Sequence, residues 1–301
     1  MELADSGVVR TRVGLNELTS YRLGGPATYF AEVEDRAGLS VIAAALATDP
    51  QPVLVLGRGS NLVISDRGFD GLVLRLGHGF GAIGLEPDGS VSAGGWAPLP
   101  QVARLAAAGG RRGLEFLIGV PGSTGGGVRQ NAGCFGLEIA DVLETAELCD
   151  LTTGLTRVVP GVELDMSYRR TNIATTEVVI GARLRATPGD ANEGLALIRE
   201  HTRWRRLHQP GGTLNAGSVF KNPPGQAAGA IIDRLGLKGY RIGGASVSEK
   251  HANFFVAIPG TRALDVYLLT REVARIVQSA TGIELEPEIQ FVGDFDEGTG
   301  A

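Results

Sequence analysis

Residues 119–127 read Gly119-Val-Pro-Gly-Ser-Thr-Gly-Gly-Gly127, and Asn131-Ala-Gly-Cys-Phe-Gly136 follows shortly after. Seven glycines and few charged residues lie between positions 119 and 136. Each glycine costs about 0.5–1 kcal/mol of conformational entropy relative to alanine, so a purely structural loop has little use for so many. A loop whose main chain wraps a diphosphate or a flat ring does have a use for them. We therefore predict a ligand-binding loop here.

The glycine bias extends over the whole chain, where 45 of 301 residues are glycine, about twice the usual share of roughly 7%. The glycines stand in short clusters between apolar runs, which excludes a flexible linker or a collagen-like chain. With 43% hydrophobic and 20% charged residues, the composition is that of a globular protein. The 28 basic and 33 acidic residues give a net charge of −5, so we expect no nucleic-acid partner.

Localisation and metal content follow from what the sequence lacks. No apolar run approaches the roughly 20 residues of a membrane span, so we expect no membrane association. The first residues lack the basic and apolar regions of a signal peptide, which favours a cytoplasmic protein. Cys134 and Cys149 are too few for a disulfide framework or a zinc site, so we expect no metal.

The residue pattern predicts two α+β domains, residues 1–187 and 188–301, with the boundary near Thr187-Pro-Gly-Asp190. We expect the last strand to pack back on the N-terminal part. Hydrophobic periodicity predicts helices over 38–47, 98–108, 191–207, 226–235 and 262–280, and strands over 52–56, 71–76, 90–94, 142–148, 156–159, 178–185, 254–258 and 288–292.

Two further segments could carry chemistry. Gly57-Arg-Gly-Ser-Asn61 follows a buried strand, an arrangement that presents main-chain N–H groups to phosphates, although a plain tight turn fits equally well. It lacks the third glycine of the dinucleotide fingerprint, and the chain has no P-loop. In Asn215-Ala-Gly-Ser-Val-Phe-Lys-Asn-Pro223, Ser218 could be a nucleophile, a proton donor or a cap. Taken alone, the cap is favoured, because no hydrolase elbow surrounds this serine.

In their order, these segments resemble the MurB family of UDP-N-acetylenolpyruvoylglucosamine reductases, from about Thr19 to Gly293. Thr19-Ser-Tyr-Arg-Leu-Gly-Gly-Pro-Ala27 resembles the opening motif of the family, and Ser167-Tyr-Arg169 and Leu285-Glu-Pro-Glu288 resemble its catalytic segments. Only 48 residues separate Arg169 from Ser218, which is similar to the compact, type II branch. The resemblance implies a PCMH-type (vanillyl-alcohol-oxidase-like) FAD-binding region over 1–187 and a smaller α+β substrate-binding domain over 188–301.

The resemblance also implies an activity. FAD would be the cofactor and NADPH the hydride donor, and the enolpyruvyl ether of UDP-N-acetylglucosamine would be reduced to UDP-N-acetylmuramate for peptidoglycan synthesis. No separate nicotinamide domain is visible, so we expect NADPH and the UDP-sugar to use one cleft in turn. We expect a monomer. The alternatives are a flavin oxidase or dehydrogenase of the same fold with another substrate, a non-catalytic flavin-binding module, and a serine hydrolase built on Ser218.

Site residues carry over from the family by position. Charge that builds on the substrate carboxylate needs a cation and a hydrogen-bond donor nearby. Arg169 would clamp that carboxylate, Glu288 would hydrogen-bond to it or orient its neighbours, and Ser218 would donate a proton with help from a neighbour such as Lys221. Substrate contacts would come from Tyr168, Lys221 and Asn222. Cofactor contacts would come from Gly57, Arg58, Gly59, Ser60, Asn61, Leu62, Gly119, Pro121, Gly122, Ser123, Gly126, Gly127, Asn131 and Gly133.

Two other residues in these motifs are open to interpretation. Cys134 lies inside the glycine-rich loop, where we interpret it as a small buried residue. The alternative is a covalent link to the flavin, as in some relatives of the wider fold. His251, in Ser248-Glu-Lys-His-Ala-Asn253, stays unassigned.

Overall fold

The structure, a computed structural model, describes residues 7–295 and divides by its internal contacts into two compact units. The chain passes from one unit to the other after Thr11, Thr28, Arg58, Asp70 and Arg205. Unit 1 contains the residues up to Thr11, Tyr29–Arg58 and Gly71–Arg205, and unit 2 contains Arg12–Thr28, Gly59–Asp70 and the residues from Arg206 onward.

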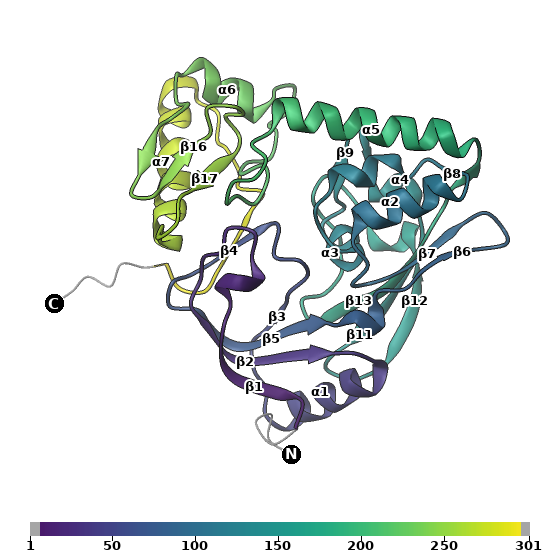
Figure 1. Ribbon diagram of the computed structural model, residues 1–301. Helices are drawn as coiled ribbons and strands as arrows, with labels where there is room; N and C mark the ends of the chain where they lie inside the picture. Colours follow the sequence, from purple (N-terminus) through teal and green to yellow (C-terminus); the bar gives the residue numbers. More distant parts are fainter. Residues whose placement is uncertain (1–6, 296–301) are drawn as a thin grey trace. The chain divides into compact units, whose positions relative to one another are not determined.

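Unit 1 is built on two sheets (Figure 1). The larger is antiparallel, with the order β12-β11-β13-β7-β6, and the smaller has the order β1-β2-β5-β3, in which β3 and β5 are parallel. The strands are β1 (Val9–Gly14), β2 (Pro26–Val33), β3 (Val53–Val55), β5 (Phe69–Leu76), β6 (Ile83–Leu85), β7 (Val91–Gly94), β11 (Leu143–Asp150), β12 (Thr156–Pro160) and β13 (Glu177–Leu184). Strands β1, β2 and β5 each run across the division between the units.

Helices, 3-10 turns and two short pairs of strands complete unit 1. The helices are α1 (Arg36–Thr48), α2 (Leu99–Ala108), α3 (Thr124–Arg129), α4 (Ile139–Val142) and α5 (Ala191–His208), with 3-10 turns η3 (His78–Phe80), η4 (Glu115–Gly119) and η5 (Gly161–Leu164). The two-stranded pairs are β9 (Gly133–Cys134) with β10 (Leu137–Glu138) and β8 (Arg111–Arg112) with β14 (Thr187–Pro188).

The core of unit 1 explains where its helices lie. Helix α1 starts at Asp35, whose carboxylate accepts the N–H of Gly38 at 2.9 Å, and it packs Leu39 and Ile42 in one cluster with the apolar residues of β2 and β5. Helix α2 places a stripe of leucine, valine and alanine against the alternate apolar residues of β7, β11 and β13. Helix α1 is therefore fixed against the smaller sheet, and α2 is fixed against the larger one.

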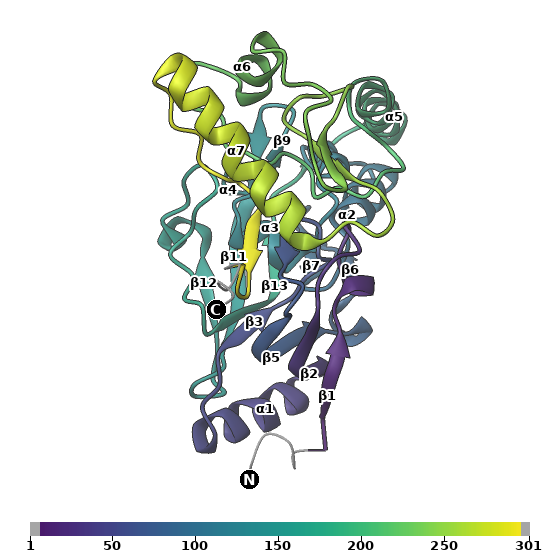
Figure 2. The same ribbon diagram turned by 90° about the vertical axis from the view of Figure 1, so that its left-hand side faces the viewer.

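Unit 2 is a smaller α+β body (Figures 1 and 2). A three-stranded antiparallel sheet, β15-β16-β17, shares one core with α7, which crosses the view in Figure 2. The last strand, β18, pairs in parallel with β4, so the C-terminal segment joins residues from the first quarter of the chain. The elements are η2 (Asn16–Leu18), β4 (Leu62–Ile64), α6 (Ala228–Arg234), β15 (Arg241–Ile242), β16 (Ala245–Val247), β17 (Phe255–Ala257), α7 (Ala263–Thr281) and β18 (Gln290–Val292).

The division by contacts differs from the boundary expected after residue 187. Most of α5 belongs to unit 1, because Ile198 is buried in the core that α2 forms. Unit 2 also takes two N-terminal pieces, which hold Tyr21, Leu23 and Val63 in its core. Such pieces cannot be found from a change in composition along the chain.

Most of the predicted helices and strands are present with small shifts at their ends. The predicted loop over 119–136, however, contains the helix α3, whose sequence Thr-Gly-Gly-Gly-Val-Arg has poor helix propensity. The Ser123 side chain accepts the N–H of Gly126 at 3.3 Å and starts this helix. Strands β1, β2 and β4 were not predicted. Within residues 7–295, no helix is both long and apolar enough to cross a bilayer.

Tyr21 provides a test of how the N-terminal piece is held in unit 2. Its side chain is 0% exposed, its hydroxyl donates to the carbonyl of Phe255 at 2.9 Å, and burial raises its pKa, so the hydroxyl stays protonated. We expect Tyr21→Phe to lower the free energy of unfolding by about 1–2 kcal/mol, because a buried carbonyl loses a donor. Urea denaturation measures this change. Tyr240→Phe, at an exposed ring, is the control and should change little.

Candidate functional site

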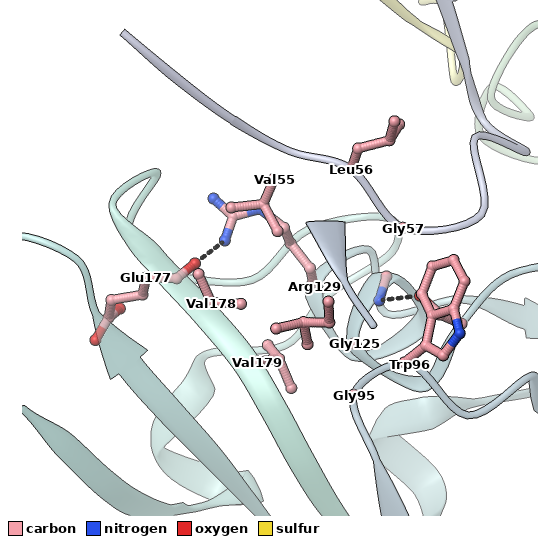
Figure 3. Close-up of a pocket in the computed structure, with 13 residues that line it drawn as sticks. Val55, Leu56, Gly57, Gly95, Trp96, Gly125, Arg129, Glu177, Val178 and Val179 are labelled. Atoms are coloured by element: carbon pink, nitrogen blue, oxygen red, sulfur yellow. Dashed lines mark hydrogen bonds between the residues drawn. The ribbon is translucent and has the colours of Figure 1, made fainter. Parts of the chain in front are cut away.

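A pocket in unit 1 brings the two glycine-rich segments together (Figure 3). Strand β3 leads into Gly57 on one side, and Ser123, Gly125 and Gly126 at the start of α3 lie on the other. A Cβ atom at Gly57 would stand 2.8 Å from the Ser123 hydroxyl oxygen, so a larger residue here would force the Ser123 side chain to shift. The remaining lining residues are Val55, Leu56, Leu76, Gly95, Trp96, Arg129, Glu177, Val178 and Val179.

The main chain around this pocket has unused hydrogen-bond donors. Within residues 7–295, the N–H groups of residues 57–61 donate no hydrogen bond, and neither do those of Gly122 and Ser123. Five successive donors in one loop form the kind of concavity that binds phosphate. The loop therefore fits an anion, and the diphosphate of FAD is an anion of the right class.

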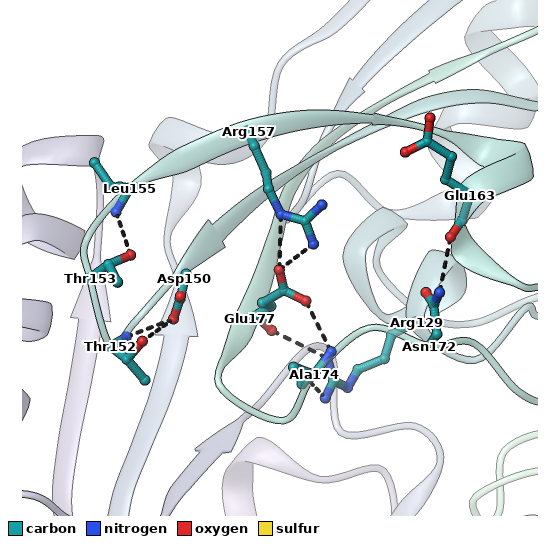
Figure 4. Close-up of polar contacts among 10 residues, drawn as sticks. All are labelled: Arg129, Asp150, Thr152, Thr153, Leu155, Arg157, Glu163, Asn172, Ala174 and Glu177. Carbon is teal, nitrogen blue, oxygen red and sulfur yellow. Dashed lines mark hydrogen bonds and ion pairs between the residues drawn. The ribbon is translucent and has the colours of Figure 1, made fainter.

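Arg129 and Trp96 add polar and aromatic surface to the pocket. The Arg129 guanidinium donates to the carbonyls of Ala174 and Glu177 at 2.9 and 3.2 Å (Figure 4), and burial lowers its pKa. Glu177 is itself paired with Arg157 (Figure 4). The sequence reasoning missed Arg129, although it is the cation that directly follows the glycine run.

The Trp96 ring lies between two cations. The guanidinium carbons of Arg58 and Arg75 each lie 5.5 Å from the centroid of the ring. Such contacts hold an aromatic ring in place by cation–π attraction. Trp96 was also missed, because nothing in its local sequence marks it.

Arg169 sits in a strained turn that Asn131 supports. Ser167 and Arg170 exchange main-chain hydrogen bonds of 3.0 Å, and Arg169 between them has φ 58°. Its guanidinium donates to the carbonyls of Asn131 and Gly133 at 3.3 and 3.4 Å and lies 4.9 Å from the Tyr168 ring centroid. A bulky residue in the left-handed region is unusual and marks a position of special function or constraint.

The side chain of Asn131 is committed to this turn. It is 0% exposed, its Nδ2 donates to the Ser167 carbonyl at 3.0 Å, and its Oδ1 accepts the Ala140 N–H at 2.9 Å. The sequence prediction gave Asn131 a contact with the cofactor. The structure instead gives its amide the task of holding the segment that carries Arg169.

Ser218 and Glu288 lie on neighbouring segments of unit 2. The Glu288 N–H donates to the Val219 carbonyl at 2.7 Å, next to Ser218. Lys221 forms an ion pair with Glu286 across the same two segments. Asn222 accepts the N–H of Ala228 at 3.0 Å and so begins α6. The structure thus brings together the two segments predicted to be catalytic, which are 70 residues apart in the sequence.

The predicted residues divide between the units. Tyr168 and Arg169 lie in unit 1, and Ser218, Lys221, Asn222 and Glu288 lie in unit 2. The loop 57–61 runs from unit 1 into unit 2, and Leu62 opens β4. Other predicted cofactor residues have packing roles that need glycine: a Cβ atom would stand 2.5 Å from the Cys134 sulfur at Gly119, 2.6 Å from Leu99 at Gly127, and 2.6 Å from the Leu137 carbonyl at Gly133.

Neighbouring glycines in α3 give a matched test of the pocket wall. A Cβ at Gly125 would lie 2.8 Å from the Val179 carbonyl and 3.1 Å from that of Gly95, whereas at Gly126 nothing lies closer than 3.4 Å. We expect Gly125→Ala to lower the free energy of unfolding by about 1–3 kcal/mol through overpacking. Gly126→Ala should leave it unchanged or raise it by up to about 1 kcal/mol. Urea denaturation measures the free energy of unfolding of both variants. An equal loss in the two would contradict the close approach of Gly125 to the Val179 and Gly95 carbonyls.

Burial raises the pKa of the Cys134 thiol, with Arg205 and Arg169 partly offsetting the effect. The reactive thiolate is therefore scarcer at neutral pH than for a free cysteine. We expect iodoacetamide to modify Cys134 more slowly than it modifies glutathione at pH 7.5, and faster as the pH rises. Mass spectrometry of the Cys134 peptide measures both rates. A flavin that stays attached to this peptide after acid precipitation would contradict the interpretation of Cys134 as a buried thiol.

Comparison with known proteins agrees with this geometry. Residues 209–292 match the C-terminal domain of UDP-N-acetylenolpyruvoylglucosamine reductase, and residues 27–159 match an FAD binding domain. UDP-N-acetylenolpyruvoylglucosamine reductase 2 of Symbiobacterium thermophilum is 42% identical over 293 residues, 97% of this chain and 94% of that protein. The reductase of Acidiphilium cryptum is 42% identical over 289 residues, 95% of this chain and 93% of that protein.

Solved structures lead to the same family. The crystal structure of the UDP-N-acetylenolpyruvylglucosamine reductase from Thermus caldophilus superposes with a TM-score of 0.82 at 37% identity, covering 95% of this chain and all of that one. The predicted fold, an α+β protein with a PCMH-type FAD-binding region and a smaller α+β domain, is confirmed. The chain belongs to the UDP-N-acetylenolpyruvoylglucosamine reductase family and is a flavin-dependent oxidoreductase.

Proposed function

We propose that this protein reduces UDP-N-acetylglucosamine enolpyruvate to UDP-N-acetylmuramate, with FAD as cofactor and NADPH as hydride donor. The observation that supports the proposal is the main-chain hydrogen bond from Glu288 to Val219, which joins the two segments that carry Ser218 and Glu288. The five unpaired amides of residues 57–61 supply the matching anion site for the cofactor.

FAD, when bound, supplies hydride transfer between NADPH and the enolpyruvyl carbon. We assign its diphosphate to the amides of the loop 57–61, which fit a phosphate group. Arg129 and Trp96 line the same pocket and would contact the cofactor as well. The predicted cofactor contact of Asn131 stays a prediction, while its side chain holds the Ser167 carbonyl.

The protein's own groups then complete the reduction. As hydride arrives at the carbon β to the substrate carboxylate, negative charge develops on that carboxylate. Arg169 stabilises it with its guanidinium, which the carbonyls of Asn131 and Gly133 orient. Ser218 transfers its hydroxyl proton to the adjacent carbon and is reprotonated from solvent. Glu288 contributes a carboxyl group whose main chain is fixed next to Ser218.

An anaerobic experiment in two steps tests the function. The purified holoprotein is first reduced with NADPH, and the enolpyruvyl substrate is then added while flavin absorbance is followed. Reoxidation with formation of the lactyl ether supports the reductase. Reoxidation only when oxygen is admitted would indicate an oxidase of the same fold, and a protein that binds no FAD would overturn the proposal.

The expected monomeric, cytoplasmic state stays a prediction, and sedimentation analysis would measure the oligomeric state.

The role of Ser218 gives a sharper prediction. Ser218→Ala should leave the reduction of flavin by NADPH within about twofold of wild type and slow reoxidation by the enolpyruvyl substrate about 10²–10⁴-fold, the usual contribution of a positioned proton donor. Stopped-flow absorbance separates the two steps. Ser40→Ala, on the exposed surface of α1, is the control. A large loss in the NADPH step would argue against proton donation by Ser218.

A further inference from the structure

Asn61, the last residue of the loop with unpaired amides, is hydrogen-bonded to the segment that carries Glu288. Its side-chain Nδ2 donates to the Glu288 carbonyl at 3.1 Å, and its own carbonyl accepts the N–H of Gln290 at 3.0 Å. The two bonds bracket this segment at the point where β18 begins to pair with β4. All of these residues belong to unit 2.

The opposite edge of the same segment contacts the strand that carries Ser218. The Glu288 N–H donates to the Val219 carbonyl at 2.7 Å, and the Val219 N–H donates to the Asn253 carbonyl at 2.8 Å. Asn253 is buried, and its side chain pairs with both main-chain groups of Phe220 at 2.8 and 3.0 Å. This side of the arrangement is therefore held by the core of unit 2, independently of the loop 57–61.

The Asn61 side chain therefore connects the loop 57–61 to the Glu288 segment, which in turn contacts the Ser218 segment. The five N–H donors of the loop are unused, while its Gly59 carbonyl accepts the N–H of Ser20 at 2.9 Å. An anion that accepts those donors would hold the loop more firmly than these contacts do alone. Ordering the loop fixes Asn61, and Asn61 fixes the Glu288 carbonyl. A side chain that only lined the anion site would have no reason to donate to a carbonyl 227 residues away.

We propose that Asn61 is a positioning residue that couples anion binding at the loop 57–61 to the placement of Glu288 and Ser218. The anion is a diphosphate ester, the chemical class of the diphosphate in FAD, so the inference rests on the proposed function for the identity of its ligand. Coupling between two sites is reciprocal. Whatever holds the Glu288 segment more firmly also strengthens diphosphate binding, by the same factor.

Hydrogen exchange tests the coupling without any turnover. FAD added to wild-type apoprotein should slow exchange of the Glu288 and Gln290 amides about five- to 150-fold, the usual range of coupling between two sites. Asn61→Leu keeps the volume of the side chain but cannot donate. In this variant, saturated with FAD, we expect most of the FAD-dependent slowing of amide exchange to disappear. The Kd for FAD should rise by the same factor by which that protection falls.

The kinetic readout separates positioning from a general loss of structure. With Asn61→Leu saturated with FAD, we expect reoxidation by the enolpyruvyl substrate to slow more than reduction of flavin by NADPH does. Asn61→Asp adds a pH test, because a protonated carboxyl can donate to the Glu288 carbonyl and an ionised one cannot. Reoxidation by Asn61→Asp should therefore recover as the pH falls, relative to wild type at the same pH.

Asn172→Leu is the matched control. The Asn172 side chain also donates to a main-chain carbonyl, that of Glu163 at 2.9 Å, but on the exposed surface of unit 1 (Figure 4). This variant should keep the exchange protection, the FAD affinity and both kinetic steps of wild type.

Equal protection by FAD in wild type and Asn61→Leu would overturn the coupling. If Asn61→Leu does not fold, Asn61→Asp decides alone, and a flat pH response relative to wild type would overturn it as well. Failure of the proposed function looks different. Wild type would then show FAD-dependent protection of Glu288 and Gln290 but no reoxidation by the enolpyruvyl substrate.

Discussion

The close approach of main chain to main chain is the constraint on which this structure depends. A Cβ atom would stand 2.1 Å from the Leu18 carbonyl at Gly59, 1.9 Å from the Pro26 carbonyl at Gly68, and 2.1 Å from the Phe80 carbonyl at Gly94. No side chain fits at such distances, so the turns that connect short strands must use glycine. The high glycine content that suggested a ligand held by main chain serves, in large part, contacts of the protein with itself.

Packing glycines and ligand-facing glycines therefore lie in the same segments. In the segment from 119 to 136, Gly119, Gly127 and Gly133 are occupied by neighbouring atoms of the protein, while Gly126 faces the pocket with space around it. Tight packing of the first group is what holds the second in place. The donors of residues 57–61 and of Ser123 stay available because the surrounding main chain is satisfied elsewhere.

Asparagine side chains have a parallel role around the proposed catalytic residues. Asn131 holds the turn of Arg169, Asn253 holds the strand of Ser218, and Asn61 holds the segment of Glu288, each through hydrogen bonds to main-chain groups. The side-chain amide of asparagine has both a hydrogen-bond donor and an acceptor. It can therefore pair with main-chain groups that lack a neighbouring strand, without adding charge. A neutral support of this kind adds no charge of its own beside the predicted catalytic residues.

The sequence by itself determined the family, the cofactor class, the longer helices, fewer than half of the strands, and the candidate residues Arg169, Ser218 and Glu288, because apolar periodicity and ordered motifs are local properties. Only the tertiary structure decided that residues 12–28 and 59–70 belong with the C-terminal unit, that Arg129 and Trp96 line the pocket, and that Asn61 and Asn131 support other segments. Each of these facts depends on a contact between residues far apart in the chain. The free energy of such contacts comes from burial and from main-chain hydrogen bonds, and neither leaves a periodic signal in the sequence.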